Sequence, residues 1–295
     1  MRIGIVGAEN SHCAAVARTL NVRKACGRAR VVAVWGETRA FAAQAAEVGQ
    51  IPRIVKRPEE MIGEIDGVML DHRHAKYHMP AVRPFVEAGI PAFVDKPFSF
   101  TLREGWALWK LARDRGVPVT SFSTIPEQAG FRKDLRRQVR AAGVIRSIET
   151  VGPCDIQSKY GGVFFYGIHQ VDAILKAFGP GIGAVQVVKA SRGNPNAVAV
   201  MTYRDGGPIA TMQLVKEGKY GFTFRAVGTK ANVDYTHASD DDPYLAGVRK
   251  FLRMFRTGVE PYTAAEILEP IAVLEALAKA IRTGKRVRVA KLPCG

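Results

Sequence analysis

Short apolar runs alternate with amphipathic segments through the first part of the chain. Runs rich in β-branched residues predict buried strands at residues 2–6, 30–35, 67–70, 91–94 and 117–120. Helical patterns lie between them, at residues 11–24, 38–48, 77–88 and 101–114. Because strands that alternate with helices pair in parallel, the pattern predicts an α/β domain with a Rossmann-type, doubly wound parallel sheet. We place this dinucleotide-binding domain at residues 1–121.

The pattern changes after residue 122. Helices are predicted at residues 127–141, 163–178 and 263–283, the second of them after the pair Gly161-Gly162. Strands are predicted at residues 144–151, 184–190, 197–203, 208–215, 221–227 and 231–235. Closely spaced strands with tight turns favour a mostly antiparallel, open sheet. Residues 122–295 are therefore expected to form an α+β domain for substrate binding and oligomerisation.

Composition narrows the class of protein. The chain has 295 residues, of which 47% are hydrophobic and 24% are charged, as in ordinary globular proteins, and this excludes a disordered or fibrous chain. No apolar run is long enough to span a membrane. The segment Met1–Gly7 runs directly into a strand and lacks the pattern of a signal peptide, so a cytoplasmic location is expected.

The chain is basic, with 43 Lys and Arg residues against 27 Asp and Glu residues and a net charge of +16. Its charges are dispersed, and the densest run, residues 132–140, is typical of a solvated helix face. We expect no nucleic-acid partner, although the positive field favours anionic substrates and cofactors. The four cysteines form no Cys-x-x-Cys pair and are expected to be reduced thiols: Cys13, Cys26, Cys154 and Cys294.

The loop after the first strand is a candidate phosphate site. It reads Gly7-Ala8-Glu9-Asn10-Ser11-His12 and keeps only the first glycine of the Gly-x-Gly-x-x-Gly fingerprint. A carboxylate near a pyrophosphate is repelled, so the Glu9 side chain is expected to turn aside while Asn10 and Ser11 face the phosphates. The residues of this loop assigned to cofactor binding are Gly7, Asn10, Ser11 and His12.

The end of the second strand carries two further candidates. Glu37 is placed to accept hydrogen bonds from ribose hydroxyls, and Arg39 is placed to bind a 2′-phosphate. The sequence does not choose between NAD and NADP.

Asp95-Lys96-Pro97 follows the strand predicted at residues 91–94, at the carboxyl edge of the sheet. A lysine held there can polarise a carbonyl or lower the pKa of an alcohol. On sequence alone, Lys96→Met is expected to abolish turnover with little loss of stability, because the lysine would contribute charge rather than packing.

His169 and Asp172 lie three residues apart on the helix predicted at residues 163–178. At this spacing Asp172 can orient His169, which can exchange a proton with a substrate hydroxyl. A lone histidine on an apolar helix is more often a core residue, but one with an aspartate at i+3 behind a double glycine is less often so.

These motifs together resemble the Gfo/Idh/MocA (glucose–fructose oxidoreductase/inositol dehydrogenase) family. That family has Glu-Lys-Pro where this chain has Asp95-Lys96-Pro97, and Asp-x-Gly-x-His-x-x-Asp where this chain has Phe165-x-Gly167-x-His169-x-x-Asp172. The tail at residues 282–287 is also similar to the family's closing helix and strand. Two departures stand out: Phe165 replaces the motif's first aspartate, and Glu9 and His12 replace glycines of the first loop.

The resemblance implies hydride transfer between NAD or NADP and a sugar-, cyclitol- or polyol-like alcohol or ketone. Lys96 and His169 would be catalytic together with Asp172, and these three residues and Tyr166 would contact the substrate. His72 and Arg73 would line the nicotinamide end of the cofactor site, next to Asp95 and Lys96. The alternative is an altered member that binds a sugar-like ligand or a partner without redox turnover.

Two further expectations concern metals and assembly. Several groups at the sheet edge could ligate a metal, but their spacing fits no standard site and Arg73 would repel a cation, so no metal is expected. The groups considered are Glu9, His12, Asp71, His72, His74 and His78. An apolar open face of the second sheet predicts a homodimer or homotetramer.

Overall fold

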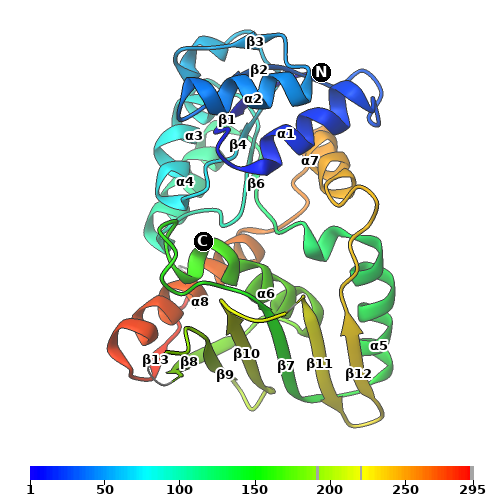
Figure 1. Ribbon diagram of the computed structural model, residues 1–295, viewed down its shortest axis with the longest axis vertical. Coiled ribbons are helices and arrows are strands. Elements are labelled where there is room, and N and C mark those ends of the chain that lie inside the picture. Colours follow the sequence, from blue (N-terminus) through cyan, green and yellow to red (C-terminus); the bar gives the residue numbers. More distant parts are fainter. Residues whose placement is uncertain (191–192, 220, 293–295) are drawn as a thin grey trace. The chain divides into compact units, whose positions relative to one another are not determined.

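The computed structural model describes residues 1–190, 193–219 and 221–292 (Figure 1). The chain divides into two compact units, each with its own sheet. The first contains Met1–Phe122 and Asp242–Ile267, and the second contains Ser123–Asp241 and Leu268–Gly295.

The first unit has a six-stranded parallel sheet in the order β3-β2-β1-β4-β5-β6. Its strands are β1 (Arg2–Val6), β2 (Arg30–Trp35), β3 (Arg53–Ile54), β4 (Gly67–Leu70), β5 (Ala92–Val94) and β6 (Val119–Thr120). The connecting helices are α1 (Ser11–Ala17), α2 (Arg39–Gly49), α3 (His78–Glu87) and α4 (Leu102–Arg115). Helix α1 lies beside α2, and α3 lies beside α4. The predicted doubly wound, Rossmann-type sheet is confirmed.

Helix α7 (Leu245–Thr257) is the main element that the apolar pattern does not predict. Its buried residues Val248, Phe251 and Leu252 join the core formed by Ile3 and Val31 of the parallel sheet. The division at Phe122 and Ser123 lies beside the predicted boundary, but residues 242–267 return to the first unit. They return because one face of α7 is apolar and is buried in that core.

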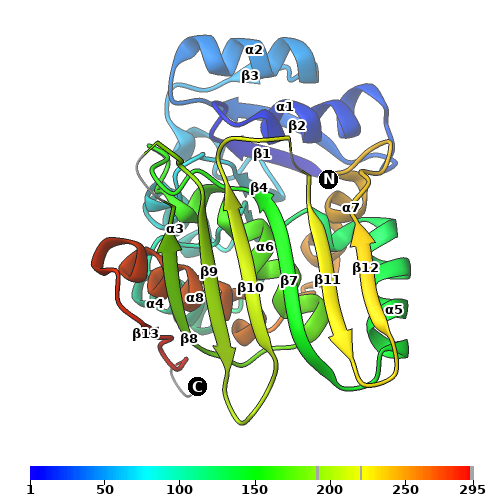
Figure 2. The ribbon, with the colours of Figure 1, turned by 60° about the horizontal axis from the view of Figure 1, so that its bottom comes forward.

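The second unit has a seven-stranded sheet in the order β12-β11-β7-β10-β9-β8-β13 (Figure 2). Its strands are β7 (Ile145–Pro153), β8 (Ile182–Lys189), β9 (Ala197–Tyr203), β10 (Ile209–Val215), β11 (Thr223–Gly228), β12 (Asn232–Thr236) and β13 (Val287–Arg288). All pairings are antiparallel except that of β7 with β10, as expected for a mostly antiparallel sheet. Helices α6 (Val163–Phe178) and α8 (Ala264–Thr283) are the long helices predicted for this region. Helix α6 and the part of α8 from Leu268 onward lie behind the sheet, whose other face is open (Figure 2).

Two long predicted helices are broken into shorter turns. Helix α1 continues as a π-helical segment, Arg18–Val22. The region predicted as a helix at residues 127–141 consists of a 3₁₀ turn (Ile125–Glu127), a π-helical segment (Phe131–Leu135) and α5 (Arg136–Ala141). Phe131 and Leu135 are fully buried, so packing of these two side chains fixes the segment.

No helix in the described ranges is both long and apolar enough to cross a membrane. In the same part of the chain Cys13, Cys26 and Cys154 are free thiols, and Cys294 lies outside the described residues.

Candidate active site

The carboxyl ends of β1, β2, β4 and β5 bring the predicted loops of the first unit to one edge of the parallel sheet. Gly7 follows β1 with φ = +104°, and a Cβ there would lie 2.6 Å from the His72 backbone nitrogen. No other residue type fits this close approach of two backbones without strain. The single retained glycine is thus the one that the packing of the loop against residues 71 and 72 requires.

Glu37 closes the first loop from the end of β2. Its Oε2 accepts hydrogen bonds from the backbone N–H groups of Ala8 and Glu9, both at 2.9 Å. Its Oε1 is buried and has no hydrogen-bond partner among the residues that the structure describes. A buried carboxylate oxygen without a donor is costly, and the predicted contact with a ribose hydroxyl would supply one. The unpartnered Oε1 is compatible with that role of Glu37, which stays a prediction.

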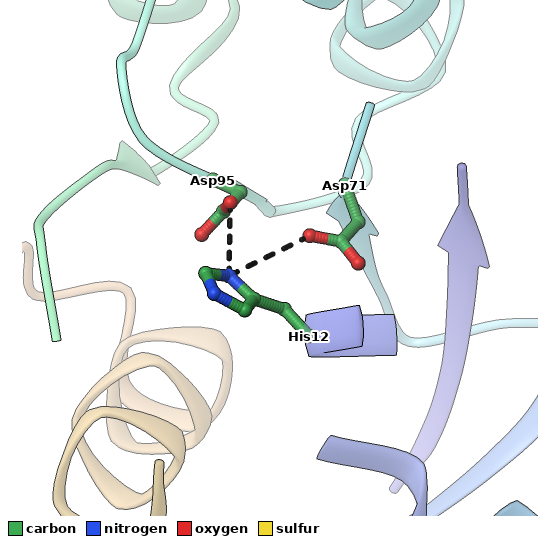
Figure 3. A group of neighbouring side chains, drawn as sticks. All are labelled: His12, Asp71 and Asp95. Carbon is green, nitrogen blue, oxygen red and sulfur yellow. Dashed lines mark hydrogen bonds and ion pairs between the residues drawn. The ribbon is translucent and has the colours of Figure 1, made fainter. Parts of the chain in front are cut away.

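Asn10 joins two buried carboxylates, Asp71 and Asp95, which Figure 3 shows beside His12. Its Nδ2 donates to Asp71 Oδ1 at 3.0 Å and to Asp95 Oδ2 at 3.1 Å. His12, at the start of α1, points to the same pair, with Nδ1 3.0 Å from Asp95 Oδ2 and 4.0 Å from Asp71 Oδ1. The amide of Asn10 is thus engaged inside the loop, and the expectation that its side chain faces the phosphates is wrong. The exposed Ser11 remains for that role, with the N–H groups of the loop other than those of Ala8 and Glu9, which Glu37 already binds.

Burial and neighbouring charges both shift the pKa values of Asp71, Asp95 and Lys96. Burial and the neighbouring Asp95 raise the pKa of Asp71 well above its usual range. Burial would also raise the pKa of Asp95, but the charge and hydrogen bond of His12 and the charge of Lys96 lower it overall. Burial lowers the pKa of Lys96, while Asp95 and Asp71 oppose that change. The edge therefore holds an ionised Asp95 beside a buried lysine whose pKa is lowered.

His12, Asp71 and Asp95 also have the spacing of metal ligands, since their ligand atoms lie within 4.8 Å of one another. The hydrogen bonds of Asn10 and His12 and the charge of Lys96 already balance the two carboxylates. A dication there would meet that ammonium group, so the donor set favours a hydrogen-bonded carboxylate pair.

The segment after β4 packs through its histidines. His78 is fully buried, with Nδ1 2.9 Å from the Pro97 carbonyl oxygen and Nε2 2.9 Å from the His72 carbonyl oxygen. It therefore ties the loop of Lys96 to the segment of His72. Burial and the neighbouring His78 lower the pKa of His72 to about 3, so this ring is neutral at physiological pH. Arg73 is half-buried next to it, whereas Arg39 is exposed at the start of α2.

In the second unit His169 lies on α6 and is almost completely buried. Its Nδ1 lies 2.7 Å from the hydroxyl of Ser123, which also accepts a hydrogen bond from the Ile125 N–H at 3.3 Å. Ser123 is absent from the sequence-based candidates because it lies 46 residues from His169 in the chain. The one sequence feature that could have indicated Ser123 is its place in the Ser-rich loop, residues 121–124, that follows the last strand of the parallel sheet.

Asp172 binds the backbone of the loop that contains Ser123. Its Oδ2 accepts hydrogen bonds from the Ser123 N–H and from Lys176 Nζ, both at 3.0 Å. Lys176 Nζ lies 3.7 Å from Glu127, and all of these side chains are buried. Burial raises the pKa of Asp172 while Lys176 opposes that change. The predicted direct pairing of Asp172 with His169 is thus replaced by contact through Ser123.

Aromatic side chains surround the start of α6. Tyr166 packs edge-on against His169 with 5.3 Å between ring centroids, and Phe165 lies 4.9 Å from Tyr160. Phe165, Tyr166 and Tyr160 line a cavity of about 540 Å³ in this unit. Phe165 therefore gives an aromatic wall to a cavity where the family motif has an aspartate.

Comparison with known proteins finds a family match for residues 1–123. They match the model of the oxidoreductase family GFO_IDH_MocA, described as an NAD-binding Rossmann fold. This part of the chain is similar to the Gfo/Idh/MocA family. The Gfo/Idh/MocA assignment agrees with the resemblance drawn from the motifs, and the cofactor is NAD or NADP, as predicted.

Solved structures extend the likeness of fold to the whole chain. Scyllo-inositol dehydrogenase from Lactobacillus casei is 16% identical with a TM-score of 0.86, covering 99% of this chain and 98% of that one. GenD2 from gentamicin A biosynthesis, solved with NAD, is 17% identical with a TM-score of 0.85, covering 99% and 97%. Myo-inositol dehydrogenase from Lactobacillus casei, solved with NAD(H) and myo-inositol, is 13% identical with a TM-score of 0.84, covering 100% and 98%. No curated protein matches this sequence.

Proposed function

We propose that the protein is an NAD-dependent dehydrogenase or reductase that acts on the CH–OH group, or the corresponding ketone, of a cyclitol-, sugar- or polyol-like molecule. The observation that carries the proposal is Lys96, buried beside two aspartates at the edge where the family binds its dinucleotide. Inositol dehydrogenases share the fold over the whole chain, and this supports the substrate class.

Each residue has a defined task in this proposal. Glu37 holds the adenosine ribose through its unpartnered Oε1, and the first loop and Ser11 hold the phosphates. Bound NAD supplies the acceptor or donor of the hydride. Lys96 donates a hydrogen bond to the reacting oxygen and stabilises negative charge on it. Asp95, kept ionised by His12, positions Lys96.

His169 exchanges the proton of the substrate hydroxyl. In oxidation the carbon loses a hydride, and the oxygen loses a proton to Nε2 of His169; reduction reverses both transfers. Because Ser123 and Asp172 hold the Nδ1 side of the ring, they are positioning residues. Phe165 gives the candidate pocket an apolar wall, which favours a substrate that presents a ring face with few hydroxyls there.

The test is a turnover screen of inositols, polyols and sugars with NAD, run on the wild type, Lys96→Met and His169→Gln. We expect turnover of at least one class by the wild type and loss of it in both variants. Since Lys96 is almost completely buried and interacts with the charges of Asp71 and Asp95, Lys96→Met should also lower the free energy of unfolding by roughly 3–5 kcal/mol. This revises the expectation of little loss that the sequence supports.

Stability and chemistry are separated by measuring the urea midpoint of each variant and assaying it well below that midpoint. Full activity in folded Lys96→Met would overturn the proposed role of this lysine. A wild type that binds NADH yet oxidises and reduces nothing in the screen would favour the alternative, a ligand-binding member without redox turnover.

A further inference from the structure

A cavity of the first unit lies at the opposite edge of the parallel sheet from the cofactor loops. It has a volume of about 760 Å³ and is lined by the residue before β1, the loop before β2 and helix α7. Met1 and Ala29 directly precede the amino ends of β1 and β2, and the Arg30 N–H donates to the Met1 carbonyl at 3.0 Å. Because the dinucleotide loops follow the carboxyl ends of the same strands, the two sites are separate.

The lining of this cavity is basic, because it contains four arginines: Arg28, Arg249, Arg253 and Arg256. The last three recur at spacings of four and three residues on α7, so they share one face of the helix. None of the four forms an ion pair within residues 1–190, 193–219 and 221–292. The nearby Asp242 already accepts from Arg23 at 2.8 Å and from Thr19 at 2.7 Å.

A second basic cavity, in the other unit, provides a comparison, because its arginines donate hydrogen bonds to the protein itself. It is lined by Arg204, Arg286 and Arg288. There Arg204 donates to the Val289 carbonyl and Arg286 donates to the Thr202 hydroxyl, so two of the guanidinium groups hold strands together. Around the first cavity, the guanidinium groups of Arg28, Arg253 and Arg256 donate no such hydrogen bond to another residue in the part of the chain that the structure describes.

The floor of the first cavity is apolar. Leu252 and Ala29 are almost fully buried there beside Met1. Guanidinium groups bind phosphate oxygens through two parallel hydrogen bonds, and an apolar floor accommodates a carbon skeleton. We infer that this cavity is a binding site for a small phosphate-bearing organic anion, distinct from the dinucleotide site.

The site does not depend on the proposed redox activity. It accounts for a cluster of like charges that costs the folded chain free energy when no anion is present. The anion would bridge α7 to the loop before β2, so binding would stabilise the return of residues 242–267 to the first unit.

The experiment is calorimetric titration of the full chain with phenyl phosphate and with inorganic pyrophosphate. The test variant is Arg253→Ala/Arg256→Ala, which removes two exposed side chains of the cavity. The matched control, Arg137→Ala/Arg140→Ala, removes the same charge from the exposed face of α5. A second control, Ser11→Asp, blocks the phosphate loop at the cofactor edge.

We expect saturable binding of phenyl phosphate that weakens by roughly tenfold or more in the cavity variant and is unchanged in both controls. Benzoate, which keeps the ring but lacks the phosphate, should bind much more weakly. Three results would overturn the inference: no saturable binding, equal weakening in the two arginine variants, or loss of binding in Ser11→Asp alone. The last would assign the phosphate to the dinucleotide loop.

Discussion

At the scale of single residues, the protein keeps its reactive groups inside hydrogen-bonded clusters. Lys96 is held with Asp71 and Asp95, and His169 is held by Ser123. In each cluster a partner fixes the position of the reactive group, the usual arrangement of an active site. Two predictions follow from the geometry of individual side chains.

The first prediction concerns the tautomer of His169. Ser123 Oγ can accept from Nδ1–H of His169 as well as from the Ile125 N–H, because a hydroxyl oxygen has two lone pairs. The neutral ring should therefore carry its hydrogen on Nδ1 and leave Nε2 ready to accept the proton of a substrate hydroxyl. Nitrogen-15 NMR of the histidine rings, assigned with His169→Gln, should show this tautomer in the wild type.

Ser123→Ala should return His169 to a mixture of tautomers, and Ser123→Thr should restore the wild-type spectrum. Turnover should fall in Ser123→Ala while NADH affinity stays unchanged, because Ser123 acts only through the ring. An unchanged tautomer in Ser123→Ala would remove Ser123 from the mechanism.

The second prediction concerns stability in acid. Folding lowers the pKa of His72 from an ordinary 6.5 to about 3, chiefly through burial. Between these values the unfolded chain binds a proton that the folded chain rejects, so stability is lost as the pH falls from 6.5 toward 3. At about pH 5 the loss from this residue is about 2 kcal/mol. His72→Phe keeps a ring beside Trp35 and Tyr77 and should remove most of that loss.

Urea unfolding at neutral pH and at about pH 5 measures the difference, with His74→Phe as the partly exposed control. His74→Phe should change the acid sensitivity less. Equal losses of stability in the wild type and in His72→Phe would show that His72 is not held neutral.

At the scale of elements, function is concentrated in the loops at the carboxyl ends of β1, β2, β4 and β5. Glu37 links two of these ends by binding the N–H groups of Ala8 and Glu9. We predict that its position also sets the cofactor preference, because a carboxylate that accepts a ribose hydroxyl would repel a 2′-phosphate.

We therefore predict that the wild type binds NADH more tightly than NADPH, and that Glu37→Ser reduces the preference by at least about tenfold. Removal of the carboxylate would leave Arg39 to attract the 2′-phosphate. Glu9→Gly, the control in the neighbouring loop, should leave NADH affinity unchanged or improve it. A wild type that prefers NADPH would contradict the role given to Glu37.

The elements show what a sequence can and cannot predict. Period and turn residues predict five of the six parallel strands and helix α6, because the side chains that define them alternate locally. They do not predict the two-residue strand β3, nor α7, whose apolar face packs on strands far away in the chain. The motifs single out Lys96 and His169 as candidates, but not Ser123 or the use of the Asn10 amide, because those depend on contacts 46 to 85 residues apart.

At the scale of the whole molecule, the open face of the second sheet bears exposed apolar side chains. Val188 and Val198 face each other across β8 and β9, and Ile209 and Val227 are also half-exposed. Exposed apolar side chains on an open sheet favour self-association, so we predict a homodimer or homotetramer formed through this face. A cytoplasmic location likewise stays a prediction of the sequence.

Size-exclusion chromatography with light scattering should give a mass of two or four times 32.2 kDa. Val188→Lys/Val198→Lys should shift the mass toward the monomer, because it places charge on both strands of the face. A monomeric wild type at micromolar concentration would contradict the predicted assembly.

The central claim is that the first unit holds a dinucleotide at the edge defined by Gly7, Glu37 and Lys96. Calorimetric titration of the full chain with NADH tests it most directly, with Ser11→Asp as the variant that places a negative charge beside the phosphates. The account predicts saturable binding of one NADH per chain, weakened by at least about tenfold in Ser11→Asp. A folded wild-type chain that binds neither NADH nor NADPH would contradict it.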